Sequence, residues 1–121
     1  ISTDIYPTIM DMVGIDRNPK QHRDGVSLVK SFDGSVLPFD RTFYWTYPSN
    51  HSLGHKASLA MRKGPYKLIY WPNNKAAELY NIATDISESK HLSKSHPEIL
   101  KAMLDTLKKW PPAKKILSSI K

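Results

Sequence analysis

The stretch "SLAMRKGPYKLIYWPNNKAAELYN", residues 58–81, decides the fold. Apolar and polar residues alternate in its runs, as they do in strands that bury one face. The sequences Lys63-Gly64-Pro65 and Pro72-Asn73-Asn74-Lys75 divide it with turn-forming residues. A similar run, "TFYWTY", precedes it at residues 42–47. We therefore expect a small antiparallel meander of three to four strands.

A helix is predicted after this meander. Ser95 and Glu98 have the spacing of a capping box around Pro97. Apolar residues then recur at helical spacing: Ile99, Leu100, Met103, Leu104, Leu107 and Trp110. Pro111-Pro112 is expected to end the helix. Because the apolar stripe must be buried, we expect the helix to cover one face of the sheet, in an α+β fold.

The first 40 residues are predicted to form a short helix and a long loop instead of strands. A short helix is expected near the start, with Thr3 or Asp4 as its cap and Gly14 as its stop. Its apolar stripe comprises Ile5, Ile9, Met12 and Val13. The next residues, 16–40, are rich in turn-formers and are predicted to be mostly loop. A loop this long in so small a domain predicts that it wraps over something larger than the present chain.

Composition excludes several classes of protein. The chain has 121 residues, of which 40% are hydrophobic and 24% charged, as in a globular domain. No apolar run approaches the roughly 18 residues of a membrane span. Cysteine is absent, which excludes a disulfide framework, a Cys-ligated zinc site and a thiol nucleophile in these residues. The net charge of 18 − 11 = +7 would attract nucleic acid, acidic lipid or sulfated substrates, but its sign does not choose among them.

The loop between residues 47 and 57 holds the candidate site. His51 and His55 lie four residues apart in it, followed by Lys56. The residues alone leave three interpretations open: metal ligands, substrate-binding residues, or solvated loop residues. A metal would need further ligands, and no acid occurs between Asp40 and Glu78. No catalytic residue pattern or nucleic-acid-binding motif is present elsewhere, so we expect no nucleic-acid partner.

The order of the segments resembles one family. "STDIYPTIMDMVGI" and "DGVSLVKSFDG" are followed by "FYWTYP", "ASLAMRKGPYKLIY", "ELYNIATDISESKHL" and "PEILKAMLDTLKKW". In this order and at this spacing they resemble the carboxy-terminal portion of type I sulfatases, the arylsulfatase-like branch of the alkaline phosphatase superfamily. The resemblance implies that residues 1–40 are a helix and connecting loop from the end of the larger α/β catalytic domain. Residues 41–121 would be the carboxy-terminal subdomain.

The resemblance also implies where the chemistry lies. The family's nucleophile is a formylglycine made in a C/S-x-P-x-R motif, beside a divalent metal, usually calcium. Neither that motif nor any cysteine occurs in this chain. We therefore expect a fragment that contains no catalytic residue or metal ligand, is inactive alone, and has the missing amino-terminal catalytic domain as its partner. Since the chain begins at Ile1 without a methionine, a targeting segment is expected upstream, and the family suggests the periplasm, the lysosome or the exterior.

The loop that carries the two histidines matches part of the substrate-pocket rim in this family. His51, His55 and Lys56 are therefore expected to bind the organic part of a sulfated carbohydrate or aryl sulfate. Lys67 is expected to be structural, with its ammonium in solvent. The alternative function is a standalone basic module that binds sulfated glycans or nucleic acid.

Overall fold

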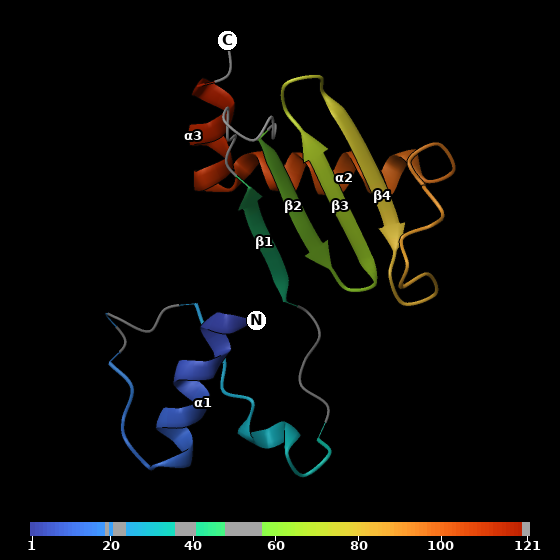
Figure 1. Ribbon diagram of the computed structural model, residues 1–121. Coiled ribbons are helices and arrows are strands. Elements are labelled where there is room, and N and C mark those ends of the chain that lie inside the picture. Colours follow the sequence, from blue (N-terminus) through green and yellow to red (C-terminus); the bar gives the residue numbers. More distant parts are fainter. Residues whose placement is uncertain (19, 21–23, 36–40, 48–56, 120–121) are drawn as a thin grey trace. The chain divides into compact units, whose positions relative to one another are not determined.

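The computed structural model describes residues 1–18, 20, 24–35, 41–47 and 57–119. It divides into two compact units, Ile1–Phe39 and Asp40–Lys121. Each unit is described by itself (Figure 1).

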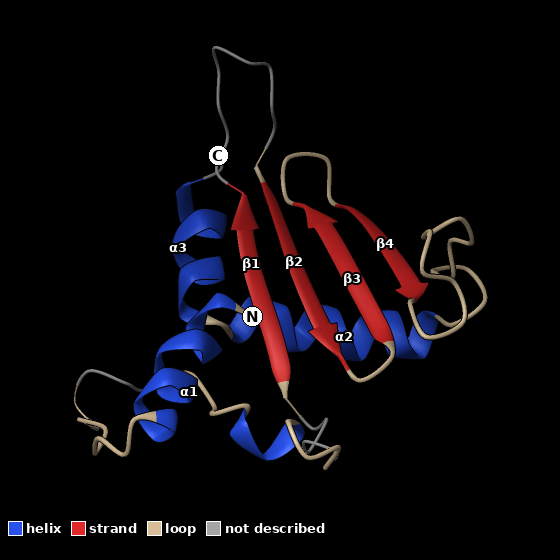
Figure 2. Cartoon of the chain, turned by 60° about the horizontal axis from the view of Figure 1, so that its bottom comes forward, coloured by secondary structure: helices blue, strands red, loops and turns tan. Residues whose placement is uncertain are grey.

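The second unit contains the predicted sheet. Its four strands are β1 (Thr42–Tyr47), β2 (Ser58–Lys63), β3 (Tyr66–Trp71) and β4 (Ala76–Asn81). They lie side by side in the order β1-β2-β3-β4, and every neighbouring pair is antiparallel (Figure 2). Gly64, in the turn between β2 and β3, has a φ of +54°, a left-handed conformation that glycine adopts readily. The predicted meander is confirmed, with four strands.

Two helices follow the sheet, α2 (Pro97–Lys109) and α3 (Pro111–Ser119). The α2 helix crosses one face of the sheet, behind the strands in Figure 1, and contacts β2 and β3. The expectation that a carboxy-terminal helix packs on the sheet is thus confirmed. The sequence did not predict α3, because Pro111-Pro112 is equally suited to begin a helix, where the missing amide would have no partner anyway.

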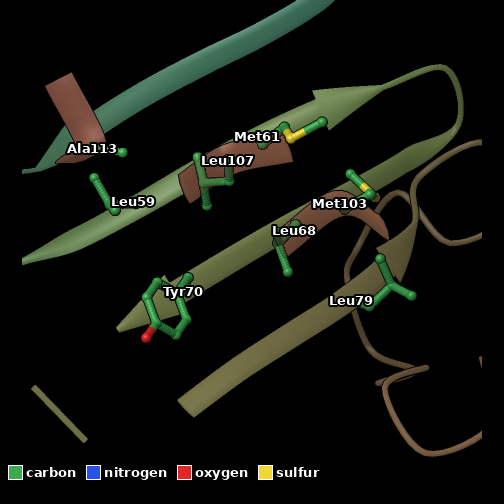
Figure 3. Close-up of a cluster of buried hydrophobic side chains, with 8 residues drawn as sticks. All are labelled: Leu59, Met61, Leu68, Tyr70, Leu79, Met103, Leu107 and Ala113. Atoms are coloured by element: carbon green, nitrogen blue, oxygen red, sulfur yellow. The ribbon is translucent and has the colours of Figure 1, made fainter. Parts of the chain in front are cut away.

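The core of the second unit lies between the sheet and these helices. Tyr44 of β1 stacks on Trp110, with the ring centroids 4.9 Å apart and the planes 18° apart. Eight buried side chains form one cluster (Figure 3): Leu59, Met61, Leu68, Tyr70, Leu79, Met103, Leu107 and Ala113. Because side chains alternate between the faces of a strand, the buried residues of β2, β3 and β4 all point toward the helices.

The capping box predicted for α2 does not form. The helix begins after His96, which makes no side-chain capping hydrogen bond. The Ser95 hydroxyl instead contacts Nδ1 of His96 at 2.9 Å and donates to the Leu92 carbonyl at 3.2 Å. Pro97 occupies the first helical position and has no amide to cap.

The first unit is built on α1 (Ile5–Met12), which continues from a 3₁₀ turn, Ser2–Asp4. The helix ends before Gly14, whose φ is +69°, as predicted for its stop. A second 3₁₀ turn, Val29–Ser31, interrupts the long segment that follows. Asp4 stands at the predicted cap position but its side chain makes no capping bond. Its Oδ1 instead accepts a hydrogen bond from the Val26 amide at 2.9 Å.

Candidate functional site

The predicted substrate loop joins β1 to β2. The side chains of His51, His55 and Lys56 lie outside the described residues, so their role stays a prediction. The ends of the two strands are described: Tyr47 pairs with Ser58, and Ala57 is buried. Leu59 and Met61 of β2 are buried in the core. The strand that follows the loop, β2, is therefore held rigidly. Binding loops are commonly supported by rigid strands of this kind.

Among the described residues, the histidines are His91 and His96, and both have local hydrogen-bond partners. His91 Nδ1 lies 3.0 Å from the Ser93 hydroxyl, and its ring meets Tyr80 edge-on at 5.9 Å between centroids. His96 contacts the neighbouring Ser95. In each case the serine is only one or two positions from the histidine, so these two hydrogen bonds order the chain locally.

Asp85 organises the loop between β4 and α2, and the sequence did not single it out. Its Oδ2 accepts a hydrogen bond from the Lys90 amide at 2.7 Å, and its Oδ1 accepts from the hydroxyls of Ser87 and Ser89 at 3.0 Å each. The backbone bonds from Lys90 and then Ser89 favour the charged form and lower the pKa of Asp85 to about 2. Serines two and four positions after an aspartate are the sequence signal that could have found this loop.

Lys67 departs from its predicted environment. Its ammonium donates to Glu88 Oε1 at 2.6 Å, and both side chains are only about 30% exposed, at 29% and 30%. The expectation that this ammonium lies in solvent was wrong, because the partner is 21 positions away and is brought close only by the fold. Glu88 has a φ of +55°, an uncommon conformation for a residue with a side chain. The pair ties the loop of Asp85 to β3.

Tyr80 and Glu78 form a second polar pair on the sheet. The Tyr80 hydroxyl donates to Glu78 Oε2 at 2.8 Å. Burial and then this hydrogen bond raise the pKa of Tyr80 to about 12. Tyr80 is therefore uncharged at neutral pH and unsuited to act as a base.

The first unit is held together by polar contacts around the start of α1. The Thr8 hydroxyl donates to the Asp4 carbonyl at 2.6 Å and accepts from the Leu28 amide at 2.9 Å. A Cβ at Gly25 would stand 2.1 Å from the Thr3 carbonyl oxygen, so only glycine fits there. The "DGVSL" segment is thereby fixed along the beginning of α1. These contacts join "STDIYPTIMDMVGI" to "DGVSLVKSFDG", the first two segments on which the resemblance rests.

Neither a metal site nor a membrane span is found in the described part of the chain. Within those residues, no three His, Asp or Glu side chains gather in a way that could hold a metal ion. None of the described helices is long and apolar enough to cross a membrane. Exposed lysines are concentrated where α2 meets α3, at positions 108, 109, 114 and 115. The Lys108 ammonium lies 5.7 Å from the centroid of the Tyr70 ring.

Comparison with solved structures shows what the chain is similar to. BT1596, a 2-O GAG sulfatase, is 25% identical over 98% of this chain and 26% of its own, with a TM-score of 0.73. Ps i-CgsB is 29% identical over 88% of this chain and 23% of its own, with a TM-score of 0.69. BT4656, solved with its substrate D-glucosamine-2-N,6-O-disulfate, is 21% identical, covers 93% and 25% respectively, and has a TM-score of 0.63.

No family model matches the chain, and no curated protein matches it in sequence. The chain spans about a quarter of the length of these solved structures. The similarity covers both units, the meander and the helix that packs on it. In fold, the chain is therefore the counterpart of the carboxy-terminal region of a sulfatase, as the order of its segments predicted.

Proposed function

We propose that this chain is the carboxy-terminal portion of a sulfatase that hydrolyses sulfate esters of carbohydrates. The observation that carries the proposal is the match to BT1596 over 98% of the chain, which amounts to only 26% of that sulfatase. The names of two similar structures refer to sulfated sugars, one a GAG sulfatase and one bound to a sulfated glucosamine. This supports a carbohydrate rather than an aryl sulfate as substrate.

The exposed helix α1 supports the assignment of residues 1–40 to the catalytic domain. Six of its eight residues are apolar or aromatic, and only Thr8 and Asp11 are polar. Within the chain, Ile5, Ile9 and Met12 are 58%, 52% and 64% exposed. A helix that is apolar nearly all round belongs in the interior of a larger protein. In this proposal, the rest of the catalytic domain covers α1.

The residues that perform the reaction are assigned to the part of the protein upstream of this chain. A formylglycine would supply the nucleophile, and a divalent metal such as calcium would supply positive charge for the sulfate. This chain would contribute the rim of the pocket. There, the imidazoles of His51 and His55 would hydrogen-bond sugar hydroxyls, and Lys56 would attract an anionic group of the substrate.

Activity of the full-length protein tests the proposal. It should release sulfate from a sulfated glucosamine, and its gene should encode C/S-x-P-x-R upstream of these residues. The 121-residue chain alone should release none, with or without calcium. Sulfate release by the isolated chain would contradict the assignment of the catalytic centre.

The rim role has a separate test. His51→Ala and His55→Ala in the full-length protein should each lower kcat/KM by about tenfold, as expected when one hydrogen bond worth about 1.4 kcal/mol is lost. His91→Ala is the matched control, because that imidazole bonds to Ser93 in a different loop. Equal kcat/KM values in all three variants would refute the rim role and leave the sulfatase assignment in place.

The alternative of a basic glycan-binding module rests on net charge and on the exposed lysines at the junction of α2 and α3. Four lysines on a helix surface are also what an ordinary solvated face presents. No other feature of the described residues favours this second function.

A further inference from the structure

The positive charge of the chain is confined to its second unit. Residues 1–39 contain four Lys or Arg and five Asp or Glu, a formal charge of 4 − 5 = −1. Residues 40–121 contain fourteen and six of these residues, a formal charge of 14 − 6 = +8. The last sixteen residues, 106–121, contain five lysines and no acid. The chain therefore ends in a basic segment in which no neighbouring carboxylate offsets the charge.

Four of these lysines form a surface that we call the lysine patch. They lie on α2 and α3, near the point where one helix follows the other (Figure 1), and all four are exposed: Lys108, Lys109, Lys114 and Lys115. Within the described part of the chain, none of them forms an ion pair with a carboxylate. Asp105, the nearest acid along the chain, is bonded to Lys101 at 3.1 Å. An ordinary solvated face mixes both signs of charge, whereas the lysine patch carries one sign alone.

The fold holds the lysine patch in place. Leu107 directly precedes the first two lysines, Ala113 directly precedes the other two, and both are completely buried. Between them, Trp110 stacks on Tyr44, and its carbonyl accepts a hydrogen bond from the Lys114 amide at 3.1 Å. The backbone beneath the lysines is therefore anchored to the core, so a ligand would not have to order it.

The surroundings of the lysine patch favour a sulfated polysaccharide over other polyanions. Single-stranded nucleic acid binds through exposed aromatic rings on which bases stack. Here Trp110 is already stacked on Tyr44, and Tyr70, beneath Lys108, is only 6% exposed. A helix that binds a membrane surface inserts an exposed apolar face, whereas Ile116 and Leu117 of α3 pack against the core. Clustered ammonium groups on a polar surface suit the sulfate groups of a polysaccharide.

We propose that the lysine patch binds a segment of a sulfated polysaccharide through its sulfate groups. The inference rests on the proposed function, because a protein that hydrolyses sulfate esters of carbohydrates encounters sulfated sugars. It assigns the lysines to this sulfatase rather than to a standalone binding module. Clustered lysines raise the local concentration of a polyanion, and binding releases the counterions of that polyanion. The affinity should therefore fall as salt is added.

Binding of a heparin oligosaccharide to the full-length protein tests this inference. The patch variant combines four substitutions: Lys108→Gln, Lys109→Gln, Lys114→Gln and Lys115→Gln. The matched control changes four other exposed lysines of the second unit: Lys63→Gln, Lys75→Gln, Lys90→Gln and Lys94→Gln. Both variants lose the same net charge, so they differ only in where the charge is lost.

The patch variant should bind heparin about thirtyfold more weakly than wild type at low salt, as expected when four exposed ion pairs are lost. The control variant should lose less than about threefold, because its lysines act only from a distance through a screening solvent. A third variant, with arginine at the four patch positions, retains the charge and should keep the wild-type affinity. All three should unfold at the wild-type midpoint, because the changed side chains are exposed.

Two results would overturn the inference. Equal losses of heparin affinity in the patch and control variants would show that net charge, and not the lysine patch, sets the affinity. A DNA duplex or vesicles of anionic lipid could also bind the wild type as tightly as heparin and bind the patch variant weakly. That result would assign the lysine patch to the other polyanion.

Sulfate release from a sulfated glucosamine by the wild-type protein, assayed in the same samples, separates the two proposals. Release together with equal heparin binding by the patch and control variants refutes only the role of the lysine patch. Weak heparin binding by the patch variant alone, without sulfate release by wild type, refutes the sulfatase assignment and leaves the lysine patch as a binding site for sulfated polysaccharide.

Discussion

The two units of the chain bury different kinds of residue. In Asp40–Lys121, eight mainly apolar side chains form a closed core between a sheet and two helices. In Ile1–Phe39, the described buried residues are Asp4, Pro7 and Thr8, while the aliphatic side chains of α1 are exposed. Burial of apolar surface is the main force that stabilises a fold. The second unit therefore has the means to be stable by itself, whereas the first depends on contacts with something else.

The largest change in stability that tests this difference between the units is expected from a substitution in the core of the second unit. Leu107 is completely buried, so Leu107→Ala should lower the free energy of unfolding by about 3 kcal/mol through lost burial and a cavity. The matched control is Ile86→Ala, which removes an exposed side chain and should cost less than about 0.5 kcal/mol. Urea denaturation of the 121-residue chain measures both. Equal effects would mean that the second unit lacks the closed core assigned to it.

A smaller effect is expected from the ion pair that fixes the loop to the sheet. A double-mutant cycle with Lys67→Met and Glu88→Gln should give a coupling of about 0.5–1 kcal/mol, since both groups are partly exposed. The control cycle uses Lys101 and Asp105 on α2, which are 81% and 53% exposed. Its coupling should be smaller, at about 0.3 kcal/mol. If the control pair couples more strongly, the tie between loop and sheet does not stabilise the second unit.

The smallest expected effect is the loss of stability at acidic pH that Asp85 causes. Because hydrogen bonds lower the pKa of Asp85 from 3.8 to about 2 in the folded state, its stabilising contribution is complete above about pH 4 and is lost as pH falls toward 2. Asp85→Asn should therefore destabilise the second unit at pH 7, and the difference from wild type should disappear near pH 2. Denaturation midpoints measured across this range test it.

Asp33→Asn is the control for this titration. Hydrogen bonds to Ser35 also lower the pKa of Asp33, but Asp33 belongs to the first unit. Unfolding of the second unit should not respond to this change. A response equal to that of Asp85→Asn would show that the two units unfold together.

Local pattern explains which parts of the fold were predictable. The strands follow from alternation in runs such as "YKLIYW", and α2 from the stripe that includes Met103 and Leu107. Two features depend on information that is not local. Lys67 finds Glu88 only through the fold, and α3 begins at prolines that suit the end of one helix and the start of the next.

The candidate site was predictable to a lesser degree. Resemblance alone assigned His51, His55 and Lys56 to a pocket rim, because a rim is defined by a substrate and a catalytic domain that this chain does not contain. The serines after Asp85 could have indicated a structured loop, but no pattern within the chain could assign the substrate.

The central claim is that the first unit is completed by the missing part of a larger protein, whereas the second is complete already. Amide hydrogen exchange tests it most directly, when measured on the 121-residue chain and on the full-length protein. The amides of β2 and β3 should be protected in both, and those of α1 only in the full-length protein. Strong protection of α1 in the 121-residue chain, or its absence in the full-length protein, would contradict the claim.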